Sequence, residues 1–254
     1  MKFSVITPAH NEENFIQKCA DSVRSAARHA NLDCEHIVVL NRCSDRTEEI
    51  AMQNGCRIVR EDARNLSRIR NAGVAVARNE IIVTIDADCW MSPNMLAEVQ
   101  DMLSTGDIIG GGVRICPERL SLGIACSLLV VLPVILWHRV SAGMFWCSRA
   151  DFNEVGGFDE TLICVEDLDF AKRLRAFGLQ SGKRYGTIKR AHITMSCRKF
   201  DQFGDWCFVC RPKLVMDIFR RKQRAADEFY YNARSSPGER SKQNKASNST
   251  TDRA

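Results

Sequence analysis

Short apolar segments alternate with helix-like segments along the chain. Runs rich in β-branched residues, such as FSVIT at 3–7 and EIIVTI at 80–85, are typical of buried strands. Between them, apolar residues recur at the spacing of an amphipathic helix. The pattern predicts strands at 3–7, 36–40, 57–60, 80–85, 107–113, 143–148 and 184–188. It predicts a first helix that ends near His29, and further helices at 45–54, 67–77, 93–103, 166–177 and, with breaks, 201–231. We therefore expect an α/β fold with a mostly parallel sheet flanked by helices and a smaller mixed region after it.

Polar clusters follow three of the predicted strands. They occupy residues 8–12, 41–45 and 86–88, directly after the first, second and fourth strands. In parallel sheets, ligands bind beyond the carboxyl ends of the strands, where such clusters meet. Their shared location indicates a ligand of the nucleotide type.

One uncharged segment raises the question of a membrane. Residues 122–137 contain 13 apolar residues among 16, which barely reaches spanning length once the flanking residues are added. A single crossing would place Asp88 and Asp167 on opposite sides of the bilayer, so they could not share a site. We therefore expect a buried or interfacial helix rather than a span.

Composition and charge narrow the class of protein. The 254 residues are 45% hydrophobic and 26% charged, as in soluble globular proteins, which excludes a chain disordered throughout. The net charge of +5 lies in the last 44 residues, which hold 11 Lys and Arg against 5 Asp and Glu. The rest of the chain is close to neutral and has no basic field for nucleic acid.

The basic C-terminal region has two interpretations. Residues 213–231 combine basic and apolar side chains, so they could dock on an anionic membrane surface or form an ordinary basic surface helix. Residues 232–254 have no apolar period, and we expect a disordered tail there. We expect a single domain at 1–231, with two halves at 1–115 and 116–231.

The cysteines indicate a reducing compartment. There are 12 of them, and Cys207 and Cys210 form the only CxxC, with no second pair at zinc spacing. No secretory signal is seen at the start, where Pro8 and His10 follow a short apolar run. We expect reduced thiols and a cytoplasmic location, either free or peripheral on the inner face of a membrane.

Two pairs of carboxylates could carry chemistry. Asp86 and Asp88 end an apolar strand, and because side chains alternate along extended backbone, both can face one side. Such oxygen ligands suit Mg²⁺ or Mn²⁺, although turn aspartates capping the helix near Pro93 would look the same. Glu166 and Asp167 open a helix, where they could serve as caps or supply a general base.

Five motifs in order resemble the family 2 glycosyltransferases of the GT-A fold. They are SVITPAHNEE, VVLNRCSDRT, TIDADCW, GGFDE and VEDLDFAKRL, and the resemblance runs from about residue 3 to residue 190. It implies transfer of a sugar from a nucleotide-diphosphate sugar, with inversion and with a divalent cation, Mn²⁺ or Mg²⁺. It also implies that 1–231 is the catalytic domain, with a nucleotide-sugar-binding half at 1–115 and an acceptor half at 116–231 that contains the apolar segment. The acceptor would be a carbohydrate, a lipid-linked molecule or a small molecule.

The resemblance also implies roles on the donor side. Residues that would line the nucleotide pocket are Pro8, Ala9, Asn11, Glu12 and Asn41. Asn41 stands where the family usually has an aspartate that contacts the base; an amide both donates and accepts, which leaves the uridine preference open. Asp45 matches the later aspartate of that turn or is a helix N-cap. Arg70 would lie near the diphosphate, or be a solvent-facing helix residue.

Metal and catalytic roles follow in the same way. Asp86 would face the ribose or the metal's waters, Asp88 would ligate the metal directly, and His192 would complete the metal or diphosphate site. Asp167 would take the proton of the acceptor hydroxyl, with Glu166 as its helper or as a contact to the acceptor.

Three alternatives stay open at this point. A nucleotidyltransferase on a similar sheet usually has a glycine-rich loop after its first strand, and PAHNEE has no glycine. A non-catalytic scaffold that binds sugar nucleotide or a membrane could retain the same residues. A retaining transferase of similar fold would also carry them.

Overall fold

The computed structural model describes residues 1–138, 141, 143–162 and 165–211. Its eight strands are β1 (Phe3–Ala9), β2 (Cys34–Leu40), β3 (Arg57–Arg60), β4 (Ile81–Ile85), β5 (Cys89–Met91), β6 (Ile108–Pro117), β7 (Met144–Ser148) and β8 (Arg184–Met195). The helices are α1 (Ile16–His29), α2 (Thr47–Gln53), α3 (Leu66–Ala75), α4 (Met95–Ser104), α5 (Leu122–His138), α6 (Arg149–Glu154), α7 (Glu166–Gln180), α8 (Arg198–Phe203) and α9 (Cys207–Cys210).

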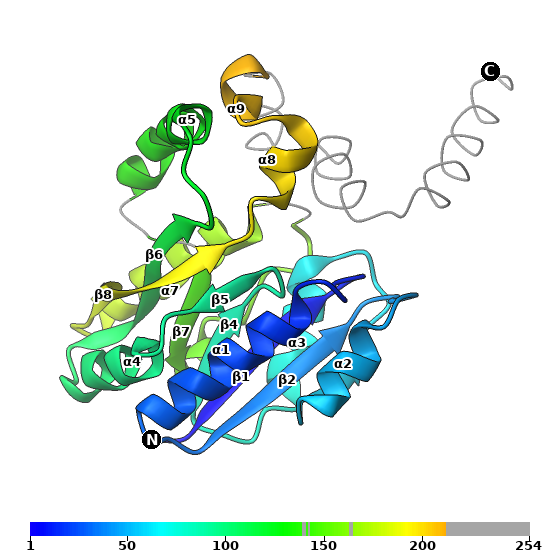
Figure 1. The fold of residues 1–254 in the computed structure, drawn as a ribbon. Helices are drawn as coiled ribbons and strands as arrows, with labels where there is room; N and C mark the ends of the chain where they lie inside the picture. The colour runs from blue at the N-terminus through cyan, green and yellow to red at the C-terminus, as the bar shows by residue number, and fades with distance from the viewer. Residues whose placement is uncertain (139–140, 142, 163–164, 212–254) are drawn as a thin grey trace, which may run out of the picture.

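All eight strands form one sheet, in the order β3-β2-β1-β4-β7-β6-β8-β5 (Figure 1). Strands β3, β2, β1 and β4 are parallel neighbours, and β6 is parallel to β8. The remaining pairs, β4 with β7, β7 with β6 and β8 with β5, are antiparallel. This arrangement confirms the expected α/β fold, with a parallel first half and a mixed second half.

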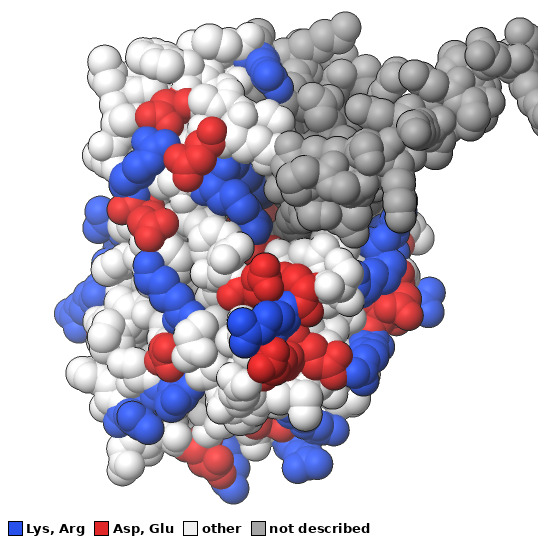
Figure 2. All heavy atoms as spheres, turned by 45° about the vertical axis from the view of Figure 1, so that its right-hand side comes forward, with Lys and Arg blue, Asp and Glu red and all other residues white. Residues whose placement is uncertain are grey.

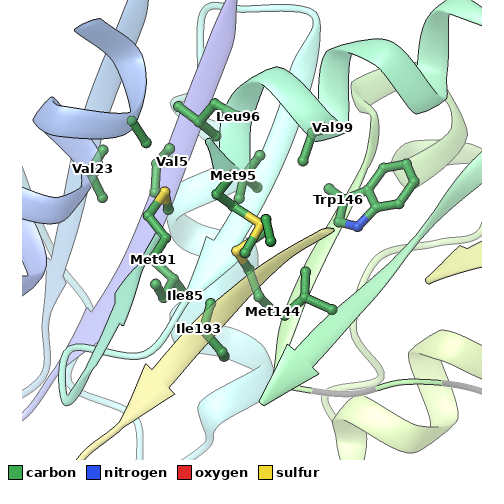
Figure 3. Packing of buried hydrophobic residues seen from close by; sticks show 14 of the residues in the cluster. Val5, Val23, Ile85, Met91, Met95, Leu96, Val99, Met144, Trp146 and Ile193 are labelled. Atoms are coloured by element: carbon green, nitrogen blue, oxygen red, sulfur yellow. The ribbon is translucent and has the colours of Figure 1, made fainter. Parts of the chain in front are cut away.

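Both faces of the sheet are covered by helices, so the central strands are buried on both sides. On one face, Val23 of α1 and Met95 and Leu96 of α4 pack on Val5 and Trp146, as Figure 3 shows. On the other face, α3, α6 and α7 bury a cluster that includes four phenylalanines. Two-sided burial explains why the parallel strands read as continuous apolar runs rather than as alternating ones.

Several predicted boundaries were wrong for identifiable reasons. Strand β1 continues through Pro8 to Ala9, because pairing with β4 ends at Ile6 and proline is tolerated where a strand has only one paired neighbour. Strand β6 continues beyond the predicted end at residue 113 to Pro117, because its pairing with β8 continues to that residue. Its glycines permit the close approach, since a Cβ on Gly111 would lie 2.0 Å from the carbonyl oxygen of Gly186 on β8.

Helix α7 likewise continues past the glycine expected to end it. A Cβ on Gly178 would lie 2.8 Å from Ile109, so this glycine permits close packing on β6 instead of ending the helix. Two short elements, β5 and α6, were not predicted at all. With three and six residues, they are too short to show a period.

The apolar segment forms helix α5, which contains Pro133 and lies beside α8 and α9 at one end of the molecule (Figure 1). Ile124 of α5 packs with Phe200 and Cys207 in a separate small cluster. Within the described part of the chain, no helix has both the length and the hydropathy to cross a membrane. The expected helix at 201–231 begins earlier, at Arg198, and breaks after Phe203; residues 212–231 and the expected tail lie outside the described residues.

Candidate sugar-nucleotide site

The loops that follow β1 and β2 are tied to each other at the carboxyl edge of the sheet. Asn11 Oδ1 accepts a hydrogen bond of 2.8 Å from the backbone N–H of Ser44, and Nδ1 of His10 lies 2.6 Å from the carbonyl oxygen of Asn41. Asp45 accepts from the backbone N–H groups of Glu13 and Thr47 at 3.0 Å each, as a residue before a helix does. Two of the three predicted polar clusters therefore form one connected wall.

Asn41 is buried at this wall with its amide already engaged by the chain. Its Nδ2 donates to the carbonyl oxygens of Glu61 and Ala63 at 2.6 and 2.8 Å, and its Oδ1 accepts from Arg42 at 3.0 Å. The side chain thus fixes the loop after β3. Contact between Asn41 and a base stays a prediction, as does the lining role of Pro8 and Ala9, which form the end of β1.

Arg70 of α3 joins two carboxylates that lie far apart in the sequence. Its Nη2 donates to Asp86 Oδ1 at 2.9 Å, and its Nη1 donates to Glu166 Oε1 at 2.8 Å. Arg70 is only 6% exposed, so the solvent-facing alternative is wrong. One guanidinium therefore brings the end of β4 to the beginning of α7.

The two carboxyl groups at the start of α7 have raised pKa values. Burial raises the pKa of Glu166 to about 7, against the opposing charge of Arg70. Burial also raises the pKa of Asp167, whose Oδ1 accepts from the backbone N–H of Leu168 at 2.7 Å. A carboxylate with a raised pKa is a stronger base than an ordinary one, which suits proton abstraction near neutral pH.

Asp88 is held by an arginine that the sequence did not single out. Arg198 Nη2 donates to Asp88 Oδ2 at 2.9 Å, and the same guanidinium donates to Glu12 at 2.7 and 3.2 Å. Ser196 adds a backbone hydrogen bond to the Asp88 carbonyl oxygen at 3.0 Å. No local pattern marks Arg198, because its partners lie 110 and 186 residues away.

The two aspartates of the TIDAD motif lie in a turn and not on the strand itself. Strand β4 ends at Ile85, and residues 86–89 form a turn closed by the Cys89 N–H on the Asp86 carbonyl oxygen at 3.0 Å. Alternation along extended backbone does not apply inside a turn. Asp86 and Asp88 therefore bind different arginines, Arg70 on α3 and Arg198 on α8.

The structure does not bring His192 to Asp88. Strand pairing and the Ser196–Asp88 hydrogen bond place Asp88 opposite Ser196, whereas the backbone of His192 bonds to Ser92 at the other end of β5. Four residues of strand separate the two positions, a distance of about 13 Å. One metal ion cannot bind both side chains at that separation, which corrects the expectation that His192 completes the metal site.

The side chains at this site fit a hard divalent cation for which water and substrate supply most of the ligands. Among the described residues, no three His, Cys, Asp or Glu side chains converge as a metal cage. Magnesium is commonly bound through one or two carboxylates together with substrate phosphates, and Asp88 would supply one such carboxylate. Glu12, Asp86 and Asp88 already outnumber the two guanidiniums of Arg70 and Arg198, even when the carboxyl groups with raised pKa values are left out of the count.

The face in Figure 2 shows acidic and basic side chains interspersed over the described residues. No broad basic field appears on that face. The mixture of signs on this face agrees with the near-neutral charge of the first 210 residues.

Comparison with known proteins gives a consistent set of relatives. Residues 4–123 match the model of the family described as glycosyl transferase family 2. Glycosyltransferase AglE of Haloferax volcanii is 35% identical over 218 residues, which covers 80% of this chain and 68% of AglE. Other curated glycosyltransferase relatives are matched over 13–33% of their own lengths.

Solved structures show the same fold at low sequence identity. S. aureus TarS 1–349 in complex with UDP-GlcNAc superimposes with a TM-score of 0.59 at 16% identity, covering 76% of this chain and 58% of that one. Mannosyltransferase PcManGT from Pyrobaculum calidifontis, in complex with GDP-Man and Mn²⁺, gives 0.58 at 17% identity and covers 76% and 56%.

Proposed function

Because the chain belongs to glycosyl transferase family 2 and has the GT-A fold, we propose that it transfers a sugar from a nucleotide-diphosphate sugar to an acceptor hydroxyl. The reaction would invert the anomeric configuration and depend on Mg²⁺ or Mn²⁺. The observation that carries the proposal is the contact of Arg70 with both Asp86 and Glu166. It brings the residues expected at the donor to the helix expected to supply the base.

Each side chain has a defined part in the proposed reaction. Asp167 accepts the proton of the acceptor hydroxyl as its oxygen attacks the anomeric carbon, so the O–C bond forms while the bond to the diphosphate breaks. Arg70 orients Glu166 beside Asp167 and fixes Asp86 toward the donor. Asp88 would hold the divalent cation, which when bound neutralises charge on the departing diphosphate.

The nucleotide base stays undecided between uracil and guanine. TarS was solved with UDP-GlcNAc and PcManGT with GDP-Man, so the fold serves both kinds of donor. Both amide hydrogens of Asn41 are donated to carbonyl oxygens of the chain, so this side chain offers a base only its oxygen and does not select between the two.

Nucleotide release from a panel of UDP-, GDP-, dTDP- and ADP-sugars, with Mn²⁺ or Mg²⁺, tests the proposal. We expect slow hydrolysis of one donor, which Asp88→Ala abolishes; Asp167→Ala should retain donor binding but lose transfer. Silence across the panel together with no donor-induced thermal shift would favour a non-catalytic scaffold instead. Silence with a metal-dependent shift would mean that the acceptor is missing from the assay.

We also propose that the acceptor side touches an anionic membrane. Among the described side chains of α5, of α9 and of the residue before α9, those that are apolar and exposed are here called the apolar surface: Leu122, Leu129, Val130, Trp206 and Val209. Residues 211–224, which follow α9 in sequence, contain six Lys and Arg and one Asp. Apolar area beside basic charge is the combination that binds anionic bilayers, and it would suit a lipid-linked acceptor.

Flotation with vesicles checks this contact. We expect the protein to float with anionic vesicles and not with neutral ones, and Leu129→Ser to weaken the binding. Leu179→Ser is a matched control, because Leu129 and Leu179 are both 61% exposed but Leu179 lies on α7. Equal loss in both variants, or binding that ignores lipid charge, would contradict the proposal.

A further inference from the structure

We propose that Arg198 is a tethered cation that competes with the divalent metal for Asp88, and that Glu12 retains it in the site when the metal displaces it. The inference rests on the proposed metal-dependent function and assigns a role to a residue outside the five motifs. The guanidinium of Arg198 contacts two carboxylates, Glu12 and Asp88, and holds them unequally.

Arg198 binds Glu12 more fully than it binds Asp88. Two of its nitrogens reach both oxygens of Glu12, Nη1 to Oε2 at 2.7 Å and Nη2 to Oε1 at 3.2 Å. A single contact of 2.9 Å joins Nη2 to Asp88 Oδ2. Bidentate pairs of arginine and carboxylate are the stronger kind, so Glu12 is the anchor and Asp88 the exchangeable partner.

Burial makes the anchor necessary. The Glu12 side chain is 1% exposed, and a carboxylate so far from water requires a cation beside it. Arg198 begins α8, and its side chain is only 18% exposed. Its guanidinium carbon lies over the ring of Phe15, 4.9 Å from the ring centroid. The guanidinium therefore stays within the site whether or not Asp88 is bound to it.

A metal ion and Arg198 cannot both neutralise Asp88 at little cost. A divalent ion on the Asp88 carboxylate would lie a few ångströms from the guanidinium, where like charges repel strongly in a partly buried site. Arg198 Nε is buried, and the present arrangement leaves its N–H without an acceptor among the described residues. If the guanidinium shifts away from Asp88, Nε and Nη2 can donate to a new anionic group such as a diphosphate.

Competition and a merely structural tie predict opposite effects on metal affinity. If Arg198 only braces the site, its removal loosens Asp88 and weakens metal binding. If it competes, its removal takes one positive charge away from the Asp88 carboxylate, and metal binding tightens.

The test is the Mn²⁺ dissociation constant of the full-length protein, measured without nucleotide from the electron paramagnetic resonance signal of unbound Mn²⁺. We expect Arg198→Gln to bind Mn²⁺ about five- to tenfold more tightly than the wild type, and Arg198→Lys to lie between them. Arg119→Gln is the matched control, since it removes the same charge and an ion pair to Asp201 of α8 without touching Asp88. Its affinity should stay within about twofold of the wild type.

Unchanged or weaker Mn²⁺ binding in Arg198→Gln overturns the inference. Should that variant fail to fold, the comparison is Glu12→Gln against the Glu12→Gln, Arg198→Gln double variant, in which residue 12 no longer carries a charge that Arg198 must neutralise. Tighter binding by the double variant is again expected. Nucleotide release by the wild type is read separately. If metal supports nucleotide release but Arg198→Gln and the wild type bind Mn²⁺ equally, only the proposed role of Arg198 is wrong. If neither the wild type nor any variant binds Mn²⁺, both that role and the proposed metal requirement are wrong.

Discussion

The guanidinium of Arg70 lies over the ring of Phe158, with 5.2 Å between its central carbon and the ring centroid. Phe158 belongs to the GGFDE motif, and its backbone N–H and carbonyl oxygen pair with the side-chain amide of Asn71 at 3.0 and 2.8 Å. The motif therefore supports the arginine from the core, while Asp86 and Glu166 hold it at the site. The GGFDE turn therefore helps to position Arg70, the residue that bridges Asp86 and Glu166.

Shortening the supporting ring should affect both stability and activity. We expect Phe158→Leu to lower the free energy of unfolding by about 1–2 kcal/mol, because it removes packing and a cation–π contact. Activity should fall further than in Phe152→Leu, which changes a ring of the same aromatic cluster. The ring of Phe152 packs on the rings of Phe158 and Phe170, whereas Phe158 carries the contact with Arg70. Chemical denaturation and donor turnover measure the two effects, and equal activity in both variants would contradict a positioning role.

Replacing Arg70 by lysine should damage catalysis more than charge loss alone explains. A single ammonium keeps the charge but cannot bridge Asp86 and Glu166 in the geometry of the guanidinium fork. We expect the turnover rate to fall roughly 100-fold while the fold is kept, since a small misplacement of reacting groups has an effect of that size. Circular dichroism and nucleotide release separate the two properties; near-normal turnover in Arg70→Lys would show that the bridge is dispensable.

Asp167→Asn should remove transfer but spare donor binding. The loss expected for a general base is about 10²- to 10⁴-fold in rate. Because burial raises the pKa of Asp167, the wild-type rate should climb with pH above the ordinary range of an aspartate. Asp169→Asn serves as the control, since this neighbour on α7 pairs with Arg173 at 2.7 Å. Comparable losses in the two variants would point to damage to α7 instead of loss of a base.

The buried carboxyl group of Glu166 should make stability depend on pH. Its pKa rises from an ordinary 4.5 to about 7 on folding, so between these values the folded state binds more protons than the unfolded state. The free energy of unfolding should therefore fall as pH rises from about 4.5 to about 7, by roughly 1–3 kcal/mol more than in Glu166→Gln. Urea unfolding at several pH values gives this difference, and a difference that grows in the opposite direction would refute it.

Much of the donor half could be predicted from the sequence. Strands such as 80–85 and the polar residues after them follow from local patterns, and parallel strands must bring their carboxyl ends to one edge. The motifs then indicated Asp86, Asp88, Glu166 and Asp167 as residues of one site. Their proximity is a consequence of topology, which local patterns reveal in advance.

Only the tertiary structure decided how these residues are partnered. The bridge through Arg70, the clamp of Arg198 on Glu12 and Asp88, and the displacement of His192 toward Ser92 depend on contacts between distant segments and on the register of β5 against β8. The sequence alone determined which chemistry the strand ends can offer, because secondary structure follows local periodicity. Which arginine neutralises which carboxylate was decided by packing, because buried charges take their partners from whatever segments the fold brings together.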